Sequence, residues 1–203
     1  MKNSNKGNKQ VLLSILGVAI LVVAVIGISF AAFNYSKTGT KVNTITTGTI
    51  TMSYSEPTNG INLVDALPTT DAKGKALTGD GKVFDFTVSA TIDGVTTINY
   101  DITAAKDETS TLDDSIIKVY LTNMDGDSDT EILAPTRASE LPTTTSSSSG
   151  APDGQFILRS GTITSSESHD YRLRMWVAED FSTLGAKGTY KLRVNVYGKA
   201  DAQ

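Results

Sequence analysis

The chain has 203 residues, no cysteine, one histidine and a formal net charge of −4. Without cysteine the protein has neither a disulfide framework nor a thiolate metal site. Lys2, Lys6 and Lys9 are the only charges before residue 32. The rest of the chain carries a net charge of −7, so no nucleic-acid partner is expected.

A continuous apolar stretch covers residues 11–33 and contains no charged residue. As a helix rising about 1.5 Å per residue it would be roughly 34 Å long, enough to cross a bilayer core of about 30 Å. Because the lysines precede it, the positive-inside rule predicts an N-terminus in the cytoplasm and residues 34–203 outside. We therefore expect an exported protein that contacts the membrane through residues 11–33 at least transiently.

The fate of this apolar segment has three interpretations. Ser29 and Ala31 stand at the −3 and −1 positions of a cut after Ala31, which predicts cleavage between Ala31 and Ala32. The length of the stretch instead favours a retained anchor, because signal-peptide apolar regions usually run about 7–15 residues. A pilin-type cut after Gly7 would keep the helix as a stalk, but Leu12 stands where many pilins carry Glu. Residues 1–31 are thus a signal peptide or a membrane anchor.

The exported part alternates between apolar and polar residues, the period of two that is typical of strands. Residues 32–55 are interpreted as a Thr-rich linker and first strand, with apolar positions at Ile45, Ile50, Met52 and Tyr54. Later runs place their apolar residues on one face each: Phe84, Phe86, Val88 and Ala90; Ile98, Tyr100, Ile102 and Ala104; Tyr171, Leu173, Met175 and Val177; Tyr190, Leu192, Val194 and Val196.

About eight to ten short strands with one apolar face each predict two antiparallel sheets packed as a β-sandwich. The expected fold class is all-β, with one hydrophobic helix before it and the sandwich spanning residues 56–203. Residues 56–81 are rich in Gly and Pro and are expected to form loops. Residues 135–154 are low in complexity and are predicted to be a mobile surface loop.

The acidic turn offers three carboxylates at alternate positions, Asp125, Asp127 and Asp129, like the opening of a calcium loop. An EF-hand would have Gly and Glu where this chain has Thr130 and Thr136. A solvated hairpin turn is therefore favoured, with calcium binding as a weak alternative. The sequence has no second His and no Cys that could form a metal or catalytic site with His169, so His169 is expected to be an exposed structural residue.

Two cationic pairs alternate outward on the last two strands, Arg172 with Arg174 and Lys191 with Arg193. If those strands pair, the four residues would form a basic docking face for an acidic segment of a neighbouring subunit. The alternative is cross-strand neutralisation by carboxylates such as Asp85. No phosphate loop, nucleophile elbow or zinc-helix motif occurs, so neither catalytic residues, a cofactor nor a metal is expected, and the protein is not expected to be an enzyme.

The junction after the apolar stretch, Ala31-Ala32-Phe33-Asn34 followed by Gly48-Thr49-Ile50-Thr51, resembles the start of the TasA/camelysin family of exported surface and biofilm-matrix proteins of Gram-positive bacteria. Looser likenesses are Leu67-Pro68, residues 84–88, residues 171–176 and residues 188–194. The resemblance implies cutting by a SipW-type signal peptidase and a jelly-roll-like sandwich. It also implies a homopolymer, in which a freed segment of about residues 32–54 completes the sheet of the next subunit.

These observations predict an exported protein of the cell surface or extracellular matrix, assembling as a fibre subunit by N-terminal strand donation. The first alternative is a membrane-anchored, monomeric β-sandwich that binds a glycan or a protein. The second alternative is a pilin-like subunit that retains its hydrophobic helix.

Overall fold

The computed structural model divides the chain into two units, one centred on Met1–Phe33 and the other on Asn34–Asp201. It describes residues 16, 34–38, 43–47, 50–55, 61–64, 66–79, 82–93, 96–181 and 188–200. The predicted cut between Ala31 and Ala32 and, apart from Leu16, the predicted span 11–33 lie outside the described residues. Among the described residues, no helix is both long enough and apolar enough to cross a bilayer.

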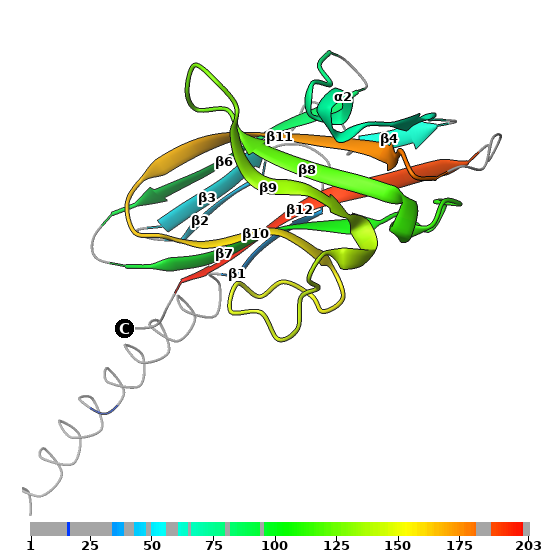
Figure 1. The fold of residues 1–203 in the computed structure, drawn as a ribbon. Coiled ribbons are helices and arrows are strands. Elements are labelled where there is room, and N and C mark those ends of the chain that lie inside the picture. The colour runs from blue at the N-terminus through cyan, green and yellow to red at the C-terminus, as the bar shows by residue number, and fades with distance from the viewer. Residues whose placement is uncertain are drawn as a thin grey trace, which may run out of the picture. The chain divides into compact units, whose positions relative to one another are not determined.

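The second unit is built almost entirely from antiparallel strands, arranged in two sheets (Figure 1). Sheet A has the order β1-β12-β7-β10, with β4 also paired to β12. Its strands are β1 (Asn34–Thr38), β4 (Ile61–Val64), β7 (Ile98–Lys106), β10 (Phe156–Ile163) and β12 (Thr189–Ala200). Sheet A therefore combines segments from both ends and the middle of the unit.

Sheet B has the order β2-β3-β6-β11-β8-β9, and the two-residue β5 pairs with β11 in parallel. Its strands are β2 (Asn43–Thr47), β3 (Ile50–Ser55), β5 (Pro68–Thr69), β6 (Val83–Ile92), β8 (Ile117–Asn123), β9 (Thr130–Arg137) and β11 (Glu167–Ala178). The all-β, antiparallel part of the predicted fold class is confirmed.

The apolar faces of the two sheets meet in one core. All sixteen apolar positions predicted to share strand faces are buried. Side chains also meet from sheet to sheet: the guanidinium of Arg159 on β10 lies 5.6 Å from the ring centre of Tyr171 on β11. Burying these apolar faces between two layers is the main favourable term for such a fold. This arrangement is consistent with the predicted β-sandwich.

Residues 56–81, expected to be loops, contain a short helix, α2 (Asp71–Lys75), besides β4 and β5. Thr70 caps the helix, because its side-chain oxygen accepts a hydrogen bond from the Lys73 N–H. Two 3-10 turns, η1 (Asp114–Ile116) and η2 (Ala138–Glu140), flank β8 and β9. Helical structure is thus limited to single turns among residues 34–200 that are described.

Residues 135–154, predicted to be a mobile surface loop, combine exposed residues with buried ones that pack against the domain. Residues 135–137 belong to β9, and Ala138, Thr144, Ser149 and Ala151 are buried. Thr144 and Gln155 hold the segment's ends together, since the Thr144 N–H donates to the Gln155 carbonyl at 2.8 Å. Serine and threonine hydroxyls of this low-complexity segment bond to groups within the fold, as Ser149 does to Asp101.

Candidate functional site

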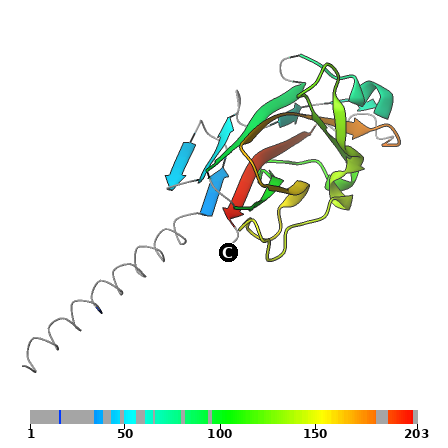
Figure 2. The ribbon, with the colours of Figure 1, turned by 90° about the vertical axis from the view of Figure 1, so that its left-hand side faces the viewer.

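The first strand after the apolar stretch lies at the edge of sheet A. Among the described strands β1 pairs only with β12, in a register that places Asn34 opposite Lys199 and Thr38 opposite Asn195. β4 occupies the same side of β12 nearer the start of that strand, opposite Thr189–Leu192, and β1 lies beside its end (Figure 2). β12 is therefore flanked on one side by two short strands from the N-terminal part of the chain.

The next two strands form a hairpin at the edge of sheet B. β2 pairs with β3, and β3 pairs with β6. The residues predicted for a donor strand lie here: Ile45 is opposite Met52, Ile50 is opposite Ile92, and Tyr54 is opposite Val88. Residues 34–55 thus add strands to both sheets, and within this single chain those strands pair with their own domain.

Met52 of this hairpin is fully buried. Its thioether packs directly over Gly198 of β12, in the opposite sheet. The sequence holds a signal for this contact, because Gly198 interrupts the inward series Tyr190, Leu192, Val194 and Val196 of the same strand. A glycine inside a strand often marks a close approach of another group.

The predicted basic docking face does not exist as one surface. β11, with Arg172 and Arg174, belongs to sheet B, whereas β12, with Lys191 and Arg193, belongs to sheet A. The condition for such a face, pairing of these two strands, is not met, because each is flanked on both sides by strands of its own sheet. Arg193 instead lines a shallow depression of about 350 Å³ beside Lys106 and lies 3.4 Å from Asp107.

The two arginines of β11 are neutralised within the domain. Arg172 makes two bonds to Asp85, from Nε to Oδ1 and from Nη2 to Oδ2, each 2.7 Å long. This pairing raises the pKa of the Arg172 guanidinium. Arg174 is 3% exposed and donates to Asp129 at 2.5 Å, to Thr122 at 3.0 Å and to the carbonyl oxygen of residue 77 at 2.8 Å.

The acidic turn uses its carboxylates in different directions. Asp129 points to Arg174, while Asp125 accepts the Asp170 N–H at 2.6 Å and lies 2.5 Å from His169 Nδ1. Asp127 is exposed. The three carboxylates therefore do not converge on one point, and the described residues contain no group of three or more His, Cys, Asp or Glu side chains placed to hold a metal.

A buried carboxylate on the outer face of sheet A fastens the serine-rich segment. Asp101 of β7 is 5% exposed and accepts hydrogen bonds from the hydroxyls of Ser147, Ser149 and Ser160. The bond from Ser149 is 2.6 Å long. Hydrogen bonds to a carboxylate are among the stronger ones in proteins, so this cluster holds residues 146–149 against the sheet.

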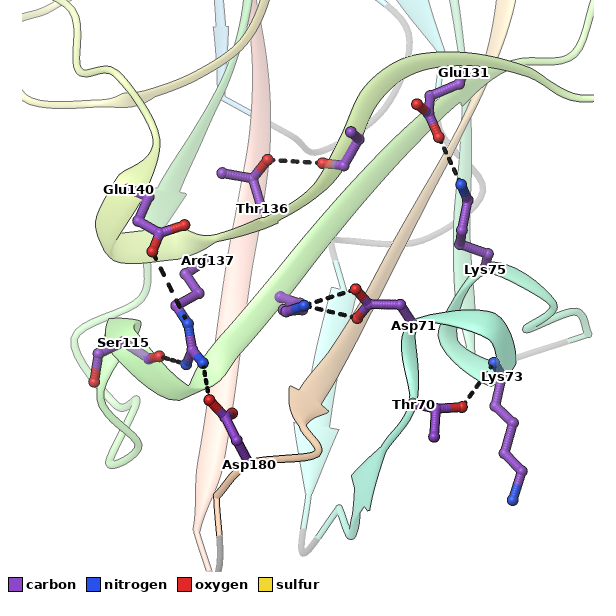
Figure 3. Close-up of polar contacts among 12 residues, drawn as sticks. Thr70, Asp71, Lys73, Lys75, Ser115, Glu131, Thr136, Arg137, Glu140 and Asp180 are labelled. Carbon is purple, nitrogen blue, oxygen red and sulfur yellow. Dashed lines mark hydrogen bonds and ion pairs between the residues drawn. The ribbon is translucent and has the colours of Figure 1, made fainter.

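Helix α2 is fastened to the outer face of sheet B by charges on neighbouring strands (Figure 3). Lys118 of β8 contacts both carboxylate oxygens of Asp71, at 2.8 and 2.7 Å, and Lys75 reaches Glu131 of β9 at 2.8 Å. Gly74 lies so close to the ring of Trp176 on β11 that no side chain would fit there. One five-residue helix thereby touches three adjacent strands.

These clusters all pair polar groups with one another and so strengthen the fold. A scan against models of protein families finds no match for this chain, and a search of curated proteins finds none either.

Proposed function

We propose that this chain is an exported structural protein of the cell surface or extracellular matrix, whose copies assemble by N-terminal strand donation. The observation that supports it best is the place of β1. This strand follows the apolar stretch directly, is five residues long and has one neighbour, β12, in the part of the chain that the structure describes. A short edge strand at a chain end is the kind of element that proteins exchange between copies.

Exchange of β1 would preserve the pairing that the strand makes within one chain. If β1 of one copy takes the place beside β12 of the next, the same five residue pairs form in the same register. Because the pairing between two copies equals the pairing that it replaces, the balance depends on concentration and on the chain that connects the donated segment, about residues 32–54, to the rest of its domain. A head-to-tail contact of this kind continues from copy to copy unless the rotation closes a ring.

The position of the apolar stretch sets the condition for this assembly. A signal peptidase cut between Ala31 and Ala32 leaves residues 32 and 33 before β1, so the strand begins almost at the new chain end. A retained helix would tether β1 to the bilayer and hinder its transfer. We propose a jelly-roll-like connection of the two sheets and a TasA/camelysin-like role, which the resemblance of the junction supports.

A disulfide trap tests the proposal, because the natural chain has no cysteine. Asn34 and Lys199 are opposite each other in the β1–β12 register, and Lys199 is exposed. Facing residues of an antiparallel pair have Cα atoms about 4.5–5.5 Å apart, within reach of a disulfide. The variant Asn34→Cys/Lys199→Cys is exported, concentrated, oxidised and run on a non-reducing gel.

Strand donation predicts a ladder of covalent oligomers that reduction converts to monomers. A single cross-linked monomer at every concentration would contradict donation and favour the membrane-anchored, monomeric binding module instead. The matched control is Asn34→Cys/Arg193→Cys: position 193 is on the same face of β12 but about 20 Å along the strand from position 199. This control should give neither the ladder nor the internal bond.

A further inference from the structure

The contact between Met52 and Gly198 joins the N-terminal segment to the last strand of the domain. Met52 lies on β3 in sheet B and is 0% exposed, and Gly198 lies on β12 in sheet A. A Cβ atom placed on Gly198 would overlap the sulfur of Met52 and lie 2.9 Å from its Cε. It would also lie 3.4 Å from Cγ2 of Ile98. The absence of a side chain at position 198 therefore creates a notch that Met52 fills.

The glycine is needed for space and not for backbone conformation. Gly79, Gly150 and Gly154 have positive φ among the glycines that the structure describes, whereas Gly198 is in regular strand pairing on both sides, opposite residues 35 and 100. A methionine can change its rotamer easily in open space. Met52 has no such space, because it is fully enclosed by the core. Any side chain at position 198 must compete with Met52 for the same volume.

We propose that Met52 and Gly198 form an anchor and notch that determine which segment, and which register, the domain accepts at its N-terminal edge. Backbone pairing alone accepts many Thr-rich strands, so selectivity has to come from a side chain that fits a pocket. A slip of one residue in β3 would turn Met52 to the other face of the sheet and leave the notch empty. The inference rests on the proposed function only for the question of which copy supplies Met52.

Variants that move side-chain volume from position 52 to position 198 test the contact between Met52 and Gly198. Gly198→Val adds three carbon atoms at the notch, and Met52→Ala removes the three heavy atoms beyond Cβ. Each single variant should lower Tm by about 5–15 °C. The double variant Met52→Ala/Gly198→Val should melt above Gly198→Val, because volume-conserving changes are tolerated best. If the decreases in Tm of the two single variants add up in the double variant, or if the double variant fails to fold, the proposed anchor and notch are overturned.

A second strand glycine provides the control. Gly161 of β10 is also in sheet A, and a Cβ atom there would lie 2.9 Å from Cε1 of Tyr100. Gly161→Val should therefore lower the stability by overlap with the Tyr100 ring. Adding Met52→Ala to Gly161→Val should restore none of the lost Tm. Recovery in this pair would mean that Met52→Ala relaxes the core in general, which would also overturn the proposal.

Mixing two full-length exported chains shows which copy fills the notch. One chain carries Asn34→Cys with Met52→Ala, and the other carries Lys199→Cys with Gly198→Val. If notches accept segments from other copies, this pair should form at least several-fold more hetero-disulfide than the same pair with Met52 intact. If Tm recovers in the double variant of a single chain but no hetero-disulfide forms, the contact between Met52 and Gly198 is upheld and strand donation is contradicted. Equal hetero-disulfide from both mixtures would contradict selection by the notch.

Discussion

At the scale of residues, the arginines of β11 are neutralised within the domain by carboxylates far away in the chain. Arg174, although 3% exposed, is matched by Asp129 and by two neutral acceptors. A buried guanidinium without such partners would be strongly destabilising. Asp125 likewise ties the acidic turn to β11 through His169 and Asp170. Through these pairs the acidic turn helps to hold β8, β9 and β11 together.

The Asp125 carboxyl should make stability depend on acid pH. Burial raises its pKa, but bonds from the Asp170 N–H, His169 and Asn123 outweigh burial and hold the pKa below its usual value. Such a group contributes stability above its unfolded pKa of about 3.9, and that contribution is lost as pH falls through the lower folded pKa. Asp125→Asn should therefore show a smaller drop in Tm than the natural chain between about pH 4 and pH 2.

The control for this experiment lies in the same turn. Asp127 is exposed, and Asp127→Asn should leave the pH dependence of Tm nearly unchanged. Melting curves followed by circular dichroism at closely spaced pH values provide the measurement. Identical acid slopes for the two variants would show that the bonds to Asp125 do not hold its pKa down.

At the scale of elements, two segments of loop-like composition are fixed structural parts. Helix α2 spans three strands of sheet B through Asp71, Lys75 and Gly74. Residues 142–155 cover the outer face of sheet A and are held there by Asp101 and by the bonds between Thr144 and Gln155. Both segments pair backbone groups within themselves, since the Gly74 N–H donates to the Thr70 carbonyl and the Gly154 N–H to the Thr144 carbonyl.

Removal of the Asp101 carboxylate should release the serine-rich segment. Asp101→Ala deletes the acceptor of three serine hydroxyls, so cleavage within residues 142–153 by a broad-specificity protease should speed up by about tenfold or more. Limited proteolysis followed by mass spectrometry would locate the cut. Ser148→Ala, a change at an exposed neighbour in the same segment, is the control and should cleave like the natural chain. Equal cleavage rates for Asp101→Ala and the control would contradict this role of Asp101.

At the scale of the whole molecule, β1 connects the fold to the fate of the apolar stretch. β1 begins at Asn34, three residues after Ala31, so the proposed cleavage would also free the first strand. N-terminal sequencing of the exported protein should therefore start at Ala32, and this form should sediment as filaments. An intact Met1 chain in the membrane fraction, with no filaments, would contradict the assembly proposal and favour the anchored module. Ala31→Leu, which places a large residue at the −1 position, should block cleavage and filament formation together.

The sequence alone determined the all-β class and the inward face of the long strands, because a period of two is a local property of the chain. Phe84, Tyr100, Leu173 and Val194 are buried as their alternation predicts. Only the tertiary structure decided which strands are neighbours, since β11 and β12 have the same alternating pattern yet belong to different sheets. It also decided that Met52 meets Gly198, and that Asp101 binds serines 46 to 59 residues further along the chain. Such contacts join residues far apart in the chain, and a local pattern such as the glycine at position 198 signals a close approach without specifying its partner.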